Sequence, residues 1–100
     1  MVVDILNEGN VKVVVIEGRL DTVTAPELEK GIAPLLAERS VSVVFECKGL
    51  EYISSSGLRV VLSSYKAVLA NGGQFVLRNL TKEVRSVFDL TGFSRIMTIE

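Results

Sequence analysis

The apolar residues at the start of the chain recur with the period of β-strands. Residues 2–6 hold four apolar side chains around one aspartate, and residues 11–17 hold five that fall on both faces of a strand. Residues 7–10, Asn-Glu-Gly-Asn, have the composition of a tight turn, so the two segments predict a β-hairpin. A strand that is apolar on both faces usually lies inside a sheet covered by helices.

Residues 24–36 predict the first helix. Thr24 stands where an N-cap belongs, and Glu27 stands three residues later, as in a capping box. The apolar residues that follow recur at i, i+4, i+7 and i+8, which is one stripe of a helix. Pro34 interrupts this stripe. Because an interior proline removes a backbone hydrogen bond and costs about 3 kcal/mol, we expect a kink or two short helices here.

The rest of the pattern predicts two more helices and three more strands. Strands are indicated at residues 41–47 and 74–78, with a short last strand at 96–99. Apolar residues between 58 and 69 recur with helical spacing, and Thr81 stands at the start of another helical stripe. The order of elements is therefore β-β-α-β-α-β-α-β.

This order predicts the fold class and the place where function resides. Strands that alternate with helices imply parallel crossovers, and the hairpin adds one antiparallel strand. We predict a single small α/β domain of residues 1–100 with a mixed, mostly parallel sheet. Three predicted loops, 18–24, 48–56 and 79–81, follow strands that enter helices, so they share one edge of the sheet. That edge is where ligands and partners usually meet such a fold.

Composition excludes several classes of function. Eleven basic and 12 acidic residues leave a net charge of −1 without a basic cluster, which argues against nucleic-acid binding. The longest apolar run, residues 13–16, is far shorter than the ~20 residues that cross a bilayer. No leader-like segment is visible, so we expect a cytoplasmic protein without membrane insertion.

The histidine and cysteine content excludes further kinds of site. The chain has no histidine, which removes the usual base of a serine hydrolase and the usual ligands of a zinc site. The single cysteine, Cys47, lies in an apolar run and is predicted to be a buried structural thiol. No glycine-rich nucleotide motif is present either. We therefore expect no enzyme, no metal and no cofactor.

Residues 54–56 are three serines in a row, followed by Gly57. The structural interpretation makes Ser56 the N-cap of a helix that begins at Gly57. It explains neither the other serines nor a glycine at a helix start. The catalytic interpretation lacks a base to activate a serine. The third interpretation is phosphorylation, because a helix N-terminus stabilises an added phosphate while the new charge changes the contact surface.

The stretch VVFECKGLEYISSSGLRVVL resembles the signature of the STAS domain, in particular that of the bacterial anti-sigma-factor antagonists. EGRLDTVTAPEL and VRSVFDLTGFSRIMTI are similar to the first loop and the C-terminal segment of that family. The resemblance implies an anti-anti-sigma factor that binds an anti-sigma factor serine kinase and so frees a sigma factor for transcription. Phosphorylation by the kinase releases the antagonist, and a serine phosphatase restores it. Carried over by position, the phosphorylated serine is Ser55.

Further site residues follow from position and from the resemblance. Ser56 and Ser54 are weaker candidates for the phosphate, and Ser55 is favoured because Ser56 is needed as the cap. Tyr52 and Ile53 are expected to anchor the loop into the core. Arg19 and Arg59 are both candidates for contacting a partner or a phosphate at this edge, and a solvated side chain is the plainer interpretation of both. The residues expected to contact the partner are Asp21, Thr22, Ser54, Ser55, Ser56, Gly57 and Arg59.

Two departures from the family pattern matter. Ser54 stands where the family usually has aspartate, and Glu46 replaces another common aspartate. Without a carboxylate beside Ser55, phosphorylation is expected to be slower, differently regulated or absent. A stand-alone STAS regulatory subunit of another complex, for example a lipid-transport ATPase, therefore stays open as an alternative that docks without phosphorylation.

Overall fold

The computed structural model describes all 100 residues, and the predicted α/β order is confirmed. One further short strand lies in the segment 48–56, which the sequence predicted as a loop. Along the chain the elements are β1 (Val2–Glu8), β2 (Val11–Leu20), α1 (Ala25–Leu36), β3 (Ser42–Glu46), β4 (Leu50–Ile53), α2 (Ser55–Ala70), β5 (Gln74–Arg78), α3 (Lys82–Thr91), the 3-10 turn η1 (Phe93–Arg95) and β6 (Thr98–Ile99).

The sheet is organised around the long strand β2. Its strand order is β1-β2-β3-β5-β6, with β1 antiparallel to β2 and the other pairs parallel. The hairpin turn is only Gly9-Asn10, and Gly9 has φ +66°, which suits a tight turn. Because β2 has ten residues, it pairs with β3 through its first half and with β4 through Gly18–Leu20.

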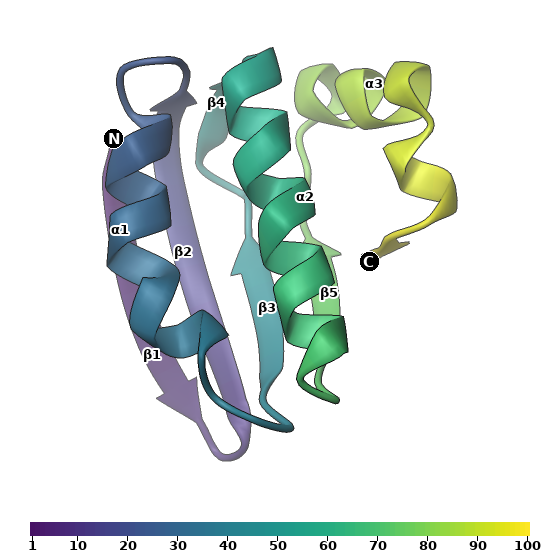
Figure 1. Cartoon of the computed structure of the whole chain (residues 1–100). Coiled ribbons are helices and arrows are strands. Elements are labelled where there is room, and N and C mark those ends of the chain that lie inside the picture. Colours follow the sequence, from purple (N-terminus) through teal and green to yellow (C-terminus); the bar gives the residue numbers. More distant parts are fainter.

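The helices pack on one face of this sheet. Figure 1 shows α1 and α2 lying side by side in front of the strands, and α3 beside the upper end of α2. One cluster of 22 buried residues joins all three helices to the facing side of the strands; its members include Phe45 and Leu77 from the sheet and Val84 and Phe88 from α3. No helix lies behind the strands in Figure 1. The two-sided apolar pattern of β2 is therefore covered on one side only.

Two local predictions, a break in the first helix at Pro34 and a buried Cys47, can be compared with the structure. Of the two outcomes expected at Pro34, a kink or two short helices, the second was wrong, because α1 runs unbroken from Ala25 to Leu36 with Pro34 inside it. Pro34 lies in the last turn, so most of the hydrogen bonds of α1 are unaffected. Cys47 is 2% exposed, which confirms a buried thiol. No helix combines the length and apolarity that crossing a bilayer requires.

Candidate functional site

The ends of β2 and β4 and the starts of α1 and α2 meet at one edge of the sheet, uppermost in Figure 1. The Ser54 N–H donates to the carbonyl of Leu20 at 2.9 Å and so joins the end of β4 to the end of β2. The hydroxyl oxygens of Thr22 and Ser56 lie 3.3 Å apart although 34 residues separate them in the sequence. The structure therefore brings the first loop and the serine triplet together.

The three serines have three different environments. Ser54, not Ser56, is the N-cap of α2: its backbone is extended (φ −93°, ψ 176°), and its hydroxyl accepts the Gly57 N–H at 3.2 Å. The sequence expectation that Ser56 is the cap was wrong, because the bond to Leu20 ends β4 at this point and the helix begins at Ser55. The Ser56 side chain is half-buried beside Thr22. The Ser55 side chain is exposed and takes part in none of the side-chain hydrogen bonds.

Gly57 is required by a close approach of α2 to the sheet. A Cβ atom at this position would lie 2.8 Å from Leu20 Cγ, 2.9 Å from Ile53 Cγ1 and 2.9 Å from the Leu20 carbonyl oxygen. Such distances are too short for carbon atoms, and one of the three contacts is rigid backbone. The poor helix former in the first turn of α2 is thus explained by packing.

Asp21 shapes the first loop from within. Its carboxylate accepts the N–H groups of Val23 at 3.0 Å and Thr24 at 3.1 Å. The Thr24 hydroxyl accepts the Asp21 N–H at 2.8 Å and donates to the Arg19 carbonyl at 2.7 Å. The Thr24 N–H is the main cause of a lowered pKa at Asp21, helped by the Thr24 hydroxyl, the Val23 N–H and the charge of Arg19. Asp21 therefore holds the loop that presents Thr22.

This loop also changes the start of α1. Because its hydroxyl is engaged within the loop, Thr24 makes no side-chain cap bond, and the Glu27 N–H bonds to the Thr24 carbonyl instead. The capping box expected at Thr24 and Glu27 was therefore wrong. Thr24 keeps its place as the residue before the helix, but the sequence assigned the wrong role to its side chain.

An aromatic residue and a cation lie on the surface of the same edge. The Arg19 guanidinium carbon is 4.1 Å from the centroid of the Tyr52 ring, which is cation–π geometry. Tyr52 is 41% exposed, so the expectation that it anchors the loop in the core was wrong. Ile53, which points to the other face of β4, is 4% exposed and does anchor it.

Glu46 links the end of β3 to the end of β5. Its carboxylate accepts from Arg78 Nε at 2.9 Å, from Asn79 Nδ2 at 3.0 and 3.1 Å, and from the Lys48 N–H at 3.1 Å. Partial burial raises the pKa of Glu46, but the hydrogen bonds from Arg78, Asn79 and Lys48, with the charge of Arg78, outweigh it and lower the pKa overall. Its negative charge is therefore balanced locally.

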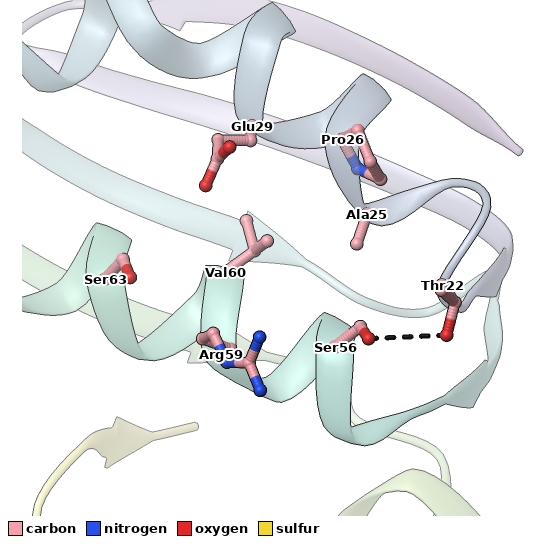
Figure 2. Close-up of a pocket in the computed structure, with 8 residues that line it drawn as sticks. All are labelled: Thr22, Ala25, Pro26, Glu29, Ser56, Arg59, Val60 and Ser63. Atoms are coloured by element: carbon pink, nitrogen blue, oxygen red, sulfur yellow. Dashed lines mark hydrogen bonds between the residues drawn. The ribbon is translucent and has the colours of Figure 1, made fainter.

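A groove of about 230 Å³ lies between the first halves of α1 and α2, next to the Thr22–Ser56 contact. Figure 2 shows the Glu29 side chain extending from α1 towards α2, and the Arg59 side chain lying along α2 on the side of Ser56. Arg59 belongs to none of the three ion pairs of the structure. The residues that line the groove are Thr22, Ala25, Pro26, Glu29, Ser56, Arg59, Val60 and Ser63.

The sequence interpretation did not single out several of these residues. On α2 it missed Val60 and Ser63, which stand at i+4 and i+7 from Ser56, so their spacing would have placed them on the same side of the helix as Ser56. The residues from α1 gave no such signal, because their position depends on how the two helices pack. The site offers hydroxyl groups, an unpaired guanidinium and the exposed cation–π pair of Arg19 and Tyr52, which are groups suited to contacting another protein.

The similarity of this chain to known proteins identifies its family. The family model of the STAS domain matches residues 3–100. This chain belongs to the STAS domain family. It is 34% identical over 93 residues to the "Anti-sigma-B factor antagonist" of Bacillus subtilis, covering 93% of this chain and 84% of the relative. The recognition of the family from the serine segment is confirmed.

Solved structures show the same STAS fold. The anti-sigma factor antagonist from Mycobacterium paratuberculosis is 27% identical, with a TM-score of 0.84 over 98% of this chain and 83% of that one. The unphosphorylated form of the antagonist SpoIIAA is 22% identical, with a TM-score of 0.83 over 99% of this chain and 88% of that one. Because SpoIIAA is only 22% identical to this chain, its similarity supports the fold and nothing further.

We predict that Gly57→Ala destabilises this STAS domain. The new methyl group would collide with Leu20 and Ile53, so the free energy of unfolding should fall by about 2 kcal/mol, as is usual for overpacking. Gly31→Ala is the matched control, because it lies inside α1 with no atom within 4 Å of the new Cβ. It should raise stability by roughly 0.5–1 kcal/mol. Urea denaturation of both variants measures the difference, and equal effects would contradict the packing role of Gly57.

We also predict that the charge of Glu46 stabilises the fold above its ordinary pKa of 4.5. Because the folded-state pKa is lowered, this contribution is present above that value and is lost as the pH falls through the folded pKa. Glu46→Gln should lower the free energy of unfolding by roughly 1 kcal/mol at pH 7, and the difference from the native chain should shrink as the pH is lowered below 4.5. Urea denaturation at pH 7 and at a series of pH values below 4.5 tests this. Glu38→Gln, at an exposed carboxylate without an ion pair, should have no effect at any of these pH values.

Proposed function

We propose that this chain, as a single STAS domain of residues 1–100, is an anti-sigma-factor antagonist. It would bind an anti-sigma factor and so free a sigma factor for transcription. Support comes from the Bacillus subtilis relative of that name, which this chain matches over most of both lengths. The role requires a contact surface and a way to change it, but no catalysis. The observation that carries the proposal is the exposed Ser55 in the first turn of α2.

Ser55 is the proposed phosphorylation site because the two neighbouring serines are engaged. Ser54 caps the helix through Gly57, and Ser56 contacts Thr22. A kinase that modified either would disturb a hydrogen bond of the fold, whereas the Ser55 hydroxyl is free. The first-turn N–H groups of a helix lack intrahelical partners, so a phosphate on Ser55 would also find donors nearby.

Ser54 keeps one property of the aspartate that the STAS signature usually has at its position. Serine and aspartate are about equally good N-caps, so the geometry of α2 does not depend on which is present. The lost property is the negative charge beside Ser55. We infer that the substitution affects the rate or the control of phosphorylation and leaves the structure of the site unchanged.

The proposed partner surface surrounds Ser55. Thr22 and Ser56 offer hydroxyl groups, and Arg59 offers an unpaired guanidinium on the same side of α2 as Ser55. Asp21 and Gly57 act indirectly, because one holds the loop and the other allows the close packing. A phosphate would add ~1.5–2 negative charges to the centre of this surface, enough to release a partner that fits the neutral form.

The partners of the proposed cycle are an anti-sigma factor that is also a serine kinase and a serine phosphatase, acting in the cytoplasm. SpoIIAA, which shares the fold, has been solved in an unphosphorylated and in a phosphorylated form. The alternative is a STAS regulatory subunit of another complex that docks through the same edge without phosphorylation. The missing carboxylate at Ser54 favours keeping this alternative, and binding that survives Ser55→Asp would support it.

The proposed site predicts the result of a phosphorylation assay. Incubation with ATP and the anti-sigma factor kinase recovered with this protein should add one phosphate, measured as intact mass. Ser55→Ala should abolish the addition, because the accepting hydroxyl is lost. Ser56→Ala should still gain the phosphate and serves as the control. A Ser55→Ala protein that gains the full phosphate would overturn the assignment.

A second assay isolates the charge at Ser54. Ser54→Asp restores a carboxylate while keeping an N-cap, so the rate of phosphorylation should rise several-fold without a change in melting temperature. Ser54→Asn provides the cap without the charge and should leave the rate near that of the native chain. If Ser54→Asn accelerated the reaction as much as Ser54→Asp, the charge would have no part in it.

A further inference from the structure

The sheet face opposite the helices carries a continuous row of apolar side chains. In register across four strands lie Leu6, Val13, Val44 and Val76, one residue from each strand. We call these four residues the back-face row. Val11 and Val15 precede and follow Val13 on the same face, because side chains two residues apart in a strand point the same way. The apolar surface therefore extends both along β2 and across the sheet.

The back-face row is separate from the core of the domain. None of its four members belongs to the 22-residue core cluster or to the apolar residues packed against that cluster. Val13 is 2% exposed because its neighbours in the row and along the strand surround it. Leu6 is 49% exposed. In Figure 1 both α1 and α2 lie on the other side of the strands, so no helix of this chain covers the row.

Such an arrangement indicates an interface. The sequence of β2 is apolar on both faces, which is typical of strands that are covered on both sides. Contiguous apolar patches on the surface of a soluble domain mark sites where another molecule binds. Covering the row would remove its methyl groups from water, at about 25 cal/mol for each Å² buried.

The charges beside the row indicate the kind of partner. By strand alternation, the same face carries Asp4, Glu8 and Glu17, and none of the three belongs to an ion pair. Arg78 also lies on this face, but it is already paired with Glu46. A second copy of the chain would bring unpaired carboxylates towards an equally acidic face, whereas a cationic partner would neutralise them.

We propose that the back face binds a cationic amphipathic helix of a partner protein. Its apolar stripe lies along β2 over Val11, Val13 and Val15, between Leu6 and Val44. Its lysines or arginines face Asp4 and Glu8, which stand beside Val15 and Val11 in the register of β1 with β2. These two carboxylates are four residues apart on one strand, about 13 Å, which corresponds to a little over two helical turns.

This inference goes beyond the proposed function and does not rest on it. The sheet edge that carries Ser54, Ser55 and Ser56, which we call the serine edge, is formed by loops and by the starts of α1 and α2, whereas the row lies on the bare face of the sheet. A partner on the back face would therefore leave Ser55 and the groove beside it accessible. Both surfaces can be occupied at once.

The probe for this surface is a designed peptide of about 18 residues, long enough to form a helix. It carries leucines at i, i+3, i+4 and i+7 and lysines elsewhere, and a counterpart carries glutamates in place of the lysines. In NMR titrations of the full chain, the lysine peptide should shift the amide signals of the back-face row, and the glutamate peptide should not. Leu6→Glu should weaken binding of the lysine peptide by about tenfold or more. Leu90→Glu, at an 88% exposed leucine of α3, is the matched control and should bind normally.

A second variant leaves the apolar row intact. Asp4→Lys combined with Glu8→Lys should abolish binding of the lysine peptide and create binding of the glutamate peptide. Circular dichroism checks that each variant is folded. Shifts confined to residues outside the row, or normal binding by both Leu6→Glu and the charge-reversed chain, would overturn the proposal. So would a concentration-dependent dimer that shifts the same signals, because a second copy would then be the occupant.

Discussion

The organisation of the serine edge depends on one backbone hydrogen bond, from the Ser54 N–H to the Leu20 carbonyl. This bond ends β4 beside the end of β2, so α2 has to begin at the next residue. Its consequences follow in order. Ser54 becomes the cap, Ser56 turns towards Thr22, and Ser55 is left facing solvent. The close approach that the bond imposes also excludes any side chain at Gly57.

The length of β2 makes this junction possible. A five-residue strand would pair with β1 and β3 and then stop, whereas β2 continues past the end of β3 and meets β4. The same strand is apolar on both faces. One side contributes Val14 and Ile16 to the core, and the other contributes Val13 to the bare face. A single strand therefore positions the serine edge and builds the apolar surface behind it.

The sequence predicted those features that local interactions determine. The cap at Thr81 and the bounds of β5 follow from neighbouring residues, and both were predicted. β4 was missed because four residues with two buried side chains form a strand only when the end of β2 provides a partner. The cap of α2 was wrongly placed at Ser56 for the same reason, because its position also depends on the end of β2. Three identical capping residues stand in a row, and the carbonyl of Leu20, distant in the sequence, selects among them.

Side-chain roles at the edge were harder to predict than backbone positions. The sequence predicted a partner contact at Asp21 and a helix cap at Thr24. In the structure the two residues bond mainly to each other and to the backbone of their own loop. Tyr52 has a large ring that would suit the core, but the ring lies against Arg19 at the surface. The partners of Asp21 and Thr24 are close in sequence, but the bonds form only in the conformation that the loop adopts between β2 and α1. Tyr52 and Arg19 meet because β4 pairs with the end of β2. Propensity therefore located the segments, and the conformation of the folded edge assigned their side chains.

The burial of Cys47 has a consequence for how the domain responds to its surroundings. Burial, with a smaller effect from the charge of Glu46, raises the pKa of the Cys47 thiol to about 12. At neutral pH only about one molecule in 10⁵ would carry the reactive thiolate, and its sulfur is enclosed on all sides. The only thiol of the chain is thus withdrawn from redox chemistry. The folded domain therefore has no thiol available for a cysteine-based response to oxidants.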